Sequence, residues 1–170
     1  MAEQLYRRRW QALVILSLSL VVIGMDNTIL NVALPTLVRD LGASASQLQW
    51  MVDAYTLAFA GLLLTMGALG DRFGRRLLLD IGLLVFVGGS IASAWAGSSG
   101  MLIATRTVMG VGGAMIMPAT LSIITDIFPL GTERDRAIGV WAAMAGLGIV
   151  LGPVIGGWLL AHFWWGSVFL

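Results

Sequence analysis

The chain has 170 residues, of which 58% are hydrophobic and 11% charged, whereas a soluble domain carries about 25% charged residues. Its formal net charge of +1 gives no indication of nucleic-acid binding. Because the chain has no cysteine and a single histidine, disulfides and thiolate zinc sites are excluded and a histidine-based metal site is disfavoured. From the apolar composition we expect a lipid-embedded protein, and we expect it to be neither an enzyme nor dependent on a cofactor.

Five apolar runs of about 20 residues or more, the length needed to cross a bilayer, follow one another between short polar segments. They cover residues 11–38, 48–69, 77–95, 101–125 and 137–163, and a sixth begins at about residue 166 and reaches Leu170 without a polar stop. The first run follows three arginines, as in a signal peptide, but it exceeds the 7–15 residues of a signal sequence and leads into further runs. We therefore predict an all-α membrane bundle with five complete transmembrane helices and the start of a sixth.

Arginines alternate between the loops that separate these runs. Three precede the first run, three lie between the second and third, and two lie between the fourth and fifth, while the opposite loops carry only Arg39. By the positive-inside rule, the N-terminus is cytoplasmic. The chain is thus expected to be a multi-pass protein of the inner (plasma) membrane.

The first run contains an acid, Asp26, about 22 Å along the helix at a rise of 1.5 Å per residue. An Asp at the bilayer centre costs about 2.5–3.5 kcal/mol to insert, so such residues usually face a cavity and carry protons or substrates. The alternative is a structural Asp whose carboxylate is satisfied by Asn27 or Asn31 of its own helix. A second acid, Asp53, lies one to two turns into the second run, where position alone favours an interfacial residue.

The turn at residues 67–79 combines glycines, which allow a sharp bend and close helix approach, with one acid among three arginines. The residues concerned are Gly67, Gly70, Asp71, Arg72, Gly74, Arg75 and Arg76. Asp126, at the inner end of the fourth run, could join them in a cytoplasmic charge cluster. The alternatives are a basic loop that only fixes orientation and, for Asp126, a solvated pair contributing under about 1 kcal/mol.

The fourth run contains Arg106, a second charge that should not lie in lipid. Gly110 and Gly113 follow it on the same face, and this small-residue face would let the first helix approach. The alternative is that Arg106, only about 8 Å from the outer end of its helix at 1.5 Å per residue, extends outward as an anchor.

In the fifth run, glycines recur every four residues at Gly148, Gly152 and Gly156, followed by Gly157. Such a stripe lets a neighbouring helix pack against bare backbone, and Pro153 removes a backbone hydrogen bond and bends the helix. Generic small-residue packing is the alternative interpretation.

Four of these segments together resemble the major facilitator superfamily. The turn GALGDRFGRRLLL (67–79) resembles its signature G-x-L-a-D-r-x-G-r-k-x-x-l, with Gly70 for Ala and Arg76 for Lys. GIVLGPVIGG (148–157) resembles the antiporter signature g-x-x-x-G-P-x-x-G-G. MDNTILNVALP (25–35) resembles L-D-x-T-v-v-N-v-A-l-P of the fourteen-helix drug:proton antiporter branch, with Met25 for Leu. The segment around Arg106 resembles l-x-x-R-x-x-q-G-x-g-a-a, with Met109 where Gln is common.

This resemblance extends over essentially the whole chain, as the N-terminal part of a larger protein. Residues 50–55, W-x-x-D-x-Y, are similar to a segment of the quaternary-ammonium efflux pumps. This similarity makes Asp53 a candidate acid in addition to Asp26. The family fold implies two bundles around a midplane site, with inverted three-helix repeats in each.

The resemblance implies export of lipophilic, cationic drugs in exchange for protons. Asp26, or else Asp53, would take the proton, and Arg106 would favour the carboxylate form, since a cation within about 4–6 Å does so. Two alternatives stay open: a truncated, transport-inactive membrane protein that acts only through helix association, and an exporter of another small molecule. Reading the coding frame past Leu170 discriminates the first of these.

Overall fold

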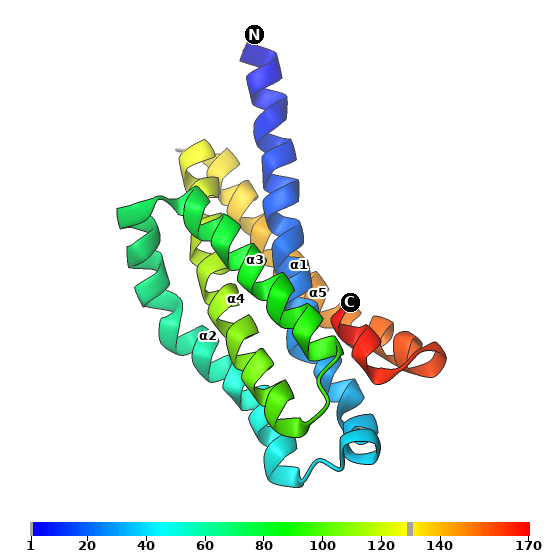
Figure 1. The fold of residues 1–170 in the computed structure, drawn as a ribbon. Coiled ribbons are helices and arrows are strands. Elements are labelled where there is room, and N and C mark those ends of the chain that lie inside the picture. The colour runs from blue at the N-terminus through cyan, green and yellow to red at the C-terminus, as the bar shows by residue number, and fades with distance from the viewer. Residues whose placement is uncertain (1, 129–130) are drawn as a thin grey trace.

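A computed structural model describes residues 2–128 and 131–170, and within these ranges the regular structure is helical, without strands (Figure 1). The long helices are α1 (Ala2–Leu41), α2 (Ala45–Phe73), α3 (Arg75–Ala94), α4 (Ser99–Ile127) and α5 (Thr132–His162), followed by a short 3-10 helix, η1 (Trp165–Phe169). All five long helices have the length and apolar character needed to cross a membrane. The predicted all-α membrane class is confirmed.

Each long helix begins before the apolar run from which it was predicted, because polar residues continue the helix beyond its apolar part. Side-chain caps define two of these starts. The Ser44 side chain accepts from the Gln47 amide while the Gln47 side chain accepts from the Ser44 amide, which fixes the start of α2. Ser98 caps α4 by accepting from the Met101 amide. The turn between α2 and α3 is a single residue, Gly74, at a φ of 107° that favours glycine.

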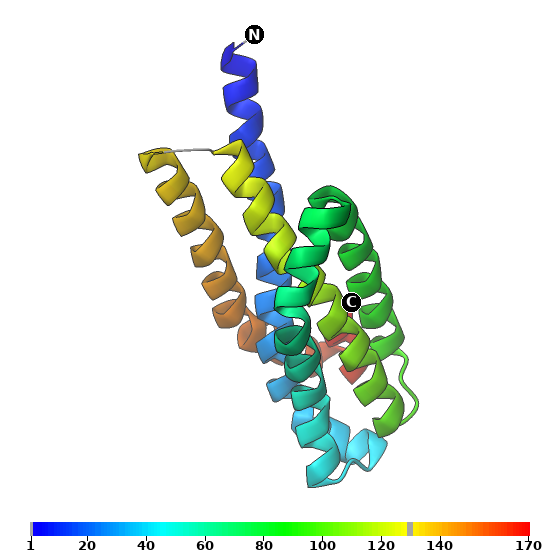
Figure 2. The same cartoon turned by 90° about the vertical axis from the view of Figure 1, so that its left-hand side faces the viewer.

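The helices pack in two groups. α1 lies along α5, and α4 lies between α2 and α3 (Figures 1 and 2). Contacts between the two groups are sparser, and η1 packs against α1, α3 and α5. A buried contact between the groups is therefore well placed to couple them.

The glycine face that follows Arg106 does not pack as expected. A Cβ on Gly110 would lie 2.5 Å from the Tyr55 carbonyl oxygen, and one on Gly113 would lie 2.9 Å from the Phe59 ring. Both neighbours belong to α2, so the prediction that this face admits the first helix is wrong. The physical reason is shape: the Tyr55 backbone and the Phe59 ring of α2 lie directly against these two positions, and only glycines on α4 leave room for them.

Candidate functional site

Asp26 of α1 and Arg106 of α4 form a buried ion pair. The Arg106 Nη1 donates to both carboxylate oxygens, at 2.6 and 2.7 Å, and Nε donates to the Met51 carbonyl oxygen of α2 at 3.2 Å. Arg106 is 1% exposed and Asp26 is 7% exposed. The two charges that sequence analysis found in apolar runs therefore meet, although 80 residues separate them.

This geometry excludes one alternative for each residue. Asn27 and Asn31 do not satisfy Asp26, because their amides donate to the carbonyl oxygens of Ile23 and Asn27. Arg106 points into the bundle rather than outward along its helix. Removing either member of a buried pair leaves a charge without compensation, which costs about 3–5 kcal/mol. A proton arriving at Asp26 would create that situation at Arg106.

Tyr55 completes the site on the side of α2. The guanidinium carbon of Arg106 lies 4.3 Å from the centroid of the Tyr55 ring, within the range of a cation–π contact. Phe59, one turn further along α2, stacks on Tyr55 with the ring centroids 6.0 Å apart. Tyr55 is the last residue of the W-x-x-D-x-Y segment, and that pattern is the signal in the sequence that could have identified it.

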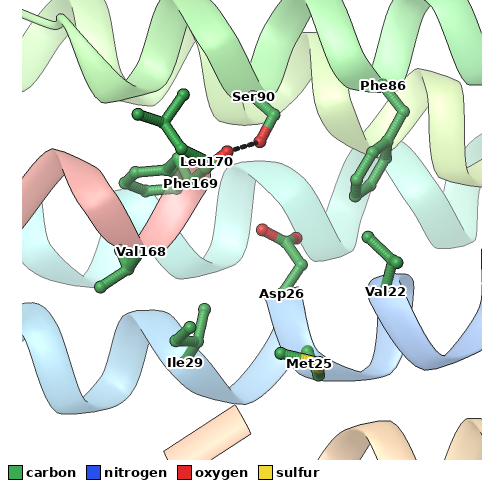
Figure 3. Close-up of a pocket in the computed structure, with 9 residues that line it drawn as sticks. All are labelled: Val22, Met25, Asp26, Ile29, Phe86, Ser90, Val168, Phe169 and Leu170. Carbon is green, nitrogen blue, oxygen red and sulfur yellow. Dashed lines mark hydrogen bonds between the residues drawn. The ribbon is translucent and has the colours of Figure 1, made fainter. Parts of the chain in front are cut away.

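A pocket borders Asp26 on the side of α3 and η1 (Figure 3). Figure 3 shows the Asp26 carboxylate pointing from α1 toward α3, between Phe86 and the segment 168–170. Apolar side chains supply most of the lining, and Ser90 is held at its edge because its hydroxyl donates to the Phe169 carbonyl oxygen at 2.5 Å. The carboxylate is thus buried among protein atoms yet adjoins a space that a proton carrier such as water could enter.

Asp53 lies apart from this pair. It is half-buried on α2 and, within the described ranges, forms no hydrogen bond or ion pair. Nothing in the geometry joins it to Asp26 or Arg106.

The charged residues of the turn gather around Arg75. Its Nε lies 3.1 Å from an Asp71 oxygen and its Nη1 lies 2.6 Å from an Asp126 oxygen, so Arg75 joins the α2–α3 turn to the end of α4, as the sequence suggested. These side chains are substantially exposed, and such pairs contribute little individually. Arg72 lies over the Phe73 ring, and Arg76 is exposed.

The glycine stripe of α5 faces α1. A Cβ on Gly148 would overlap the Val21 carbonyl oxygen, one on Gly152 would overlap the Thr28 hydroxyl, and one on Gly156 would lie 2.5 Å from Ile29. Gly157, in contrast, has no heavy atom within 4 Å of the corresponding position. Helix α1 therefore lies directly against three of these glycines, on the same stretch of helix that holds Asp26.

A bundle of membrane-length helices with an acid and an arginine buried together in its interior defines a multi-pass membrane protein built around an intramembrane ionisable site. Residues 16–170 match the Major Facilitator Superfamily, and the chain belongs to that family. The resemblance identified from the motifs is thereby confirmed.

Several relatives are named as resistance or efflux proteins. The methyl viologen resistance protein SmvA of Salmonella typhimurium is 48% identical over 163 residues, covering 96% of this chain and 33% of that protein. The multidrug efflux pump LfrA of Mycolicibacterium smegmatis is also 48% identical, covering 96% of this chain and 32% of LfrA. The chain thus spans about a third of the length of these curated relatives.

A solved structure shows the same fold. A bacterial homologue of the human lysosomal transporter Spinster, in an inward-facing and occupied conformation, superposes with a TM-score of 0.81 over 90% of this chain and 33% of that chain, at 23% identity. At this identity the likeness concerns the fold alone.

Proposed function

We propose that the chain provides the proton-coupling part of an inner-membrane antiporter that exports lipophilic, cationic drugs in exchange for protons. The observation that carries the proposal is the buried Asp26–Arg106 pair, whose carboxylate borders a pocket. The name of SmvA supports the substrate class, because methyl viologen is an organic dication, and the name of LfrA supports the export of drugs. No enzymatic step or cofactor is part of the proposal.

The coupling follows from the electrostatics of the pair. With Asp26 ionised, the pair has no net charge and α1 is held to α4. Protonation of Asp26 leaves the Arg106 charge buried without its counter-ion, which is costly enough to drive a rearrangement between helices. A cation bound in the cavity when the acid is ionised, and released when it is protonated, would then move against the proton. Asp53, half-buried and without a partner in the described structure, is the second candidate for that acid.

The test replaces Asp26 by Asn in the transporter expressed from its complete coding frame. Asn keeps the size and can still accept from Arg106, but it cannot ionise. We expect loss of ethidium efflux driven by a pH gradient, with ethidium counterflow in the absence of a gradient retained, and part of the efflux kept by Asp26→Glu. Counterflow shows that the variant is folded and binds substrate.

Asp80 supplies the control, because it is an exposed acid on α3, and Asp80→Asn should pump normally. Gradient-driven efflux at the wild-type rate by Asp26→Asn would remove Asp26 from the coupling role and shift attention to Asp53.

A second candidate is export of another small molecule. The riboflavin transporter RibZ of Clostridioides difficile is 36% identical over 164 residues, and riboflavin carries no positive charge. Efflux of an uncharged substrate in preference to ethidium would favour this alternative.

A further inference from the structure

Pro153 leaves one backbone carbonyl of α5 without its usual partner. In an α-helix, the amide of each residue donates to the carbonyl four residues earlier, so residue 153 would normally serve the Ile149 carbonyl. Proline has no amide hydrogen. The Ile149 oxygen, in the apolar part of a membrane helix, therefore needs a donor from elsewhere, because an unsatisfied carbonyl in hydrocarbon costs several kcal/mol.

Thr28 of α1 supplies that donor. Its hydroxyl oxygen lies 3.1 Å from the Ile149 oxygen, and 3.2 and 3.4 Å from the Met25 and Gly24 carbonyl oxygens of its own helix. A hydroxyl has a single hydrogen to donate. The Met25 and Gly24 carbonyl oxygens already accept hydrogen bonds from backbone amides of α1. Donation of the Thr28 hydroxyl hydrogen is therefore most stabilising at the Ile149 carbonyl oxygen.

Gly152 makes the contact possible. A Cβ at this position would overlap the Thr28 hydroxyl oxygen and would lie 2.8 Å from the Met25 carbonyl oxygen. Any larger residue would thus push Thr28 away from Ile149. Adjacent residues of α5 have complementary effects: Gly152 leaves the space for the hydroxyl, and Pro153 leaves the acceptor.

We infer that Thr28 is a positioning residue for Asp26, acting through this interhelical hydrogen bond. Residues two apart on a helix project about 200° from each other, given 3.6 residues per turn, so Thr28 faces α5 while Asp26 faces the opposite side, where α3 and α4 lie. Fixing Thr28 to α5 fixes the rotation of α1 about its axis, and with it the direction of the Asp26 carboxylate toward Arg106. The positioning role rests on the proposed function of Asp26, whereas the hydrogen bond does not.

A double-mutant cycle tests the hydrogen bond. Thr28→Val keeps the shape and removes the donor, and Pro153→Ala returns an amide to the Ile149 carbonyl. We expect Thr28→Val to lower the melting temperature of the purified full-length transporter, and to do so far less in the Pro153→Ala background. Thr28→Ser should restore most of the loss. Thr56→Val is the matched control, because the Thr56 hydroxyl donates to Val52 of its own helix. Equal effects of Thr28→Val in both backgrounds would overturn the inference.

The pH profile of efflux tests the positioning role. We expect Thr28→Val to reduce gradient-driven ethidium efflux by about five- to tenfold, the effect of one net hydrogen bond, and to move the external pH at half-maximal rate. Thr28→Ser should return the midpoint to that of the wild type. If the melting temperatures of the Thr28 and Pro153 variants are non-additive but the external pH at half-maximal efflux does not move, the hydrogen bond exists but does not position Asp26. Coupled efflux by Asp26→Asn would instead overturn the proposed function, and the melting cycle would still report on the bond.

Discussion

The Arg106 guanidinium makes three different kinds of contact: an ion pair, a hydrogen bond to a backbone carbonyl and a cation–π contact. The Asp26 carboxylate accepts from it, the Met51 carbonyl accepts from its Nε, and the Tyr55 ring lies against its guanidinium plane. A planar group with five donors suits this arrangement, because an ammonium is a compact point charge that cannot match it. Arg106 thus joins α4 to α1 and α2 within a single side chain.

The stability of the protein should depend on that side chain. Arg106→Ala leaves the Asp26 carboxylate buried without a counter-ion, and we expect a loss of about 3–5 kcal/mol, seen as a lower melting temperature in detergent. Arg106→Lys should fall between this variant and the wild type. The double variant Asp26→Asn, Arg106→Gln removes both charges and should melt above Arg106→Ala. A melting temperature for Arg106→Ala equal to that of the wild type would contradict the pairing.

Charges that lipid would not tolerate can be identified from the sequence, but not all of the residues that contact them can. Asp26 and Arg106 stand out because a charge in an apolar run is costly wherever it points. Tyr55 and Thr28 do not, because an aromatic ring or a hydroxyl is ordinary in a membrane helix. Their importance depends on which atoms of another helix lie opposite, and periodicity within one helix carries no such information.

At the scale of helices, glycines decide which pairs approach closely. The stripe of α5 and the Gly110–Gly113 face of α4 are alike in sequence, yet the first meets α1, whereas the second meets the Tyr55 backbone and the Phe59 ring of α2. Small residues predict that a helix has a close neighbour, but the shape of the opposing surface decides which one. For this reason the partner of α4 could not be predicted from the run around Arg106.

The stripe of α5 gives a prediction with an internal control. Gly156→Leu inserts a side chain against Ile29, where even a Cβ would lie 2.5 Å from Cγ1, so we expect reduced efflux from protein that still reaches the membrane. Gly152→Leu should behave in the same way. Gly157→Ala meets no atom within 4 Å and should pump and melt as the wild type does. Drug resistance at the wild-type level in both leucine variants would show that the stripe does not need close packing.

The α2–α3 turn provides a second matched pair. Gly74 has a φ of 107°, a conformation that side chains rarely adopt, so Gly74→Ala should destabilise the turn by about 1–3 kcal/mol. Gly67 belongs to the same motif, but a Cβ there would lie 3.7 Å from the nearest atom, on Pro118, which is an ordinary contact. Melting temperatures of the two alanine variants should therefore separate, and equal values would mean that the backbone at Gly74 relaxes without cost.

For the whole molecule, the helices form two groups that Asp26 and Arg106 connect. α1 packs mainly on α5, and α4 packs mainly on α2 and α3, so the ion pair crosses the sparser boundary between them. A change of charge at the Asp26 carboxylate therefore alters the interaction between the two groups of helices. The sequence predicted the helices and both charges, whereas this division depends on helix pairing and became visible only in three dimensions.

The arrangement also places the basic segments at one end. The start of α1, the α2–α3 turn and the start of α5 lie at the same end of the bundle, while the α1–α2 and α3–α4 connections lie at the other (Figure 1). Arg9 pairs with Glu133 at the first of these ends, at 3.0 Å, and Arg75 pairs with Asp71 and Asp126 there. The positive-inside rule therefore predicts that this end faces the cytoplasm.

Cysteine labelling tests this orientation in a chain that has no cysteine of its own. Phe73 is 61% exposed at the arginine-rich end, and it is a better site than Gly74, whose backbone would be strained by any side chain. In intact cells, Phe73→Cys should resist a membrane-impermeant maleimide and react with a permeant one, since the bilayer blocks only the first reagent. Ala45→Cys, exposed at the start of α2, should react with both. Labelling of Phe73→Cys by the impermeant reagent, with protection of Ala45→Cys, would reverse the orientation and place the Arg75 cluster outside the cell.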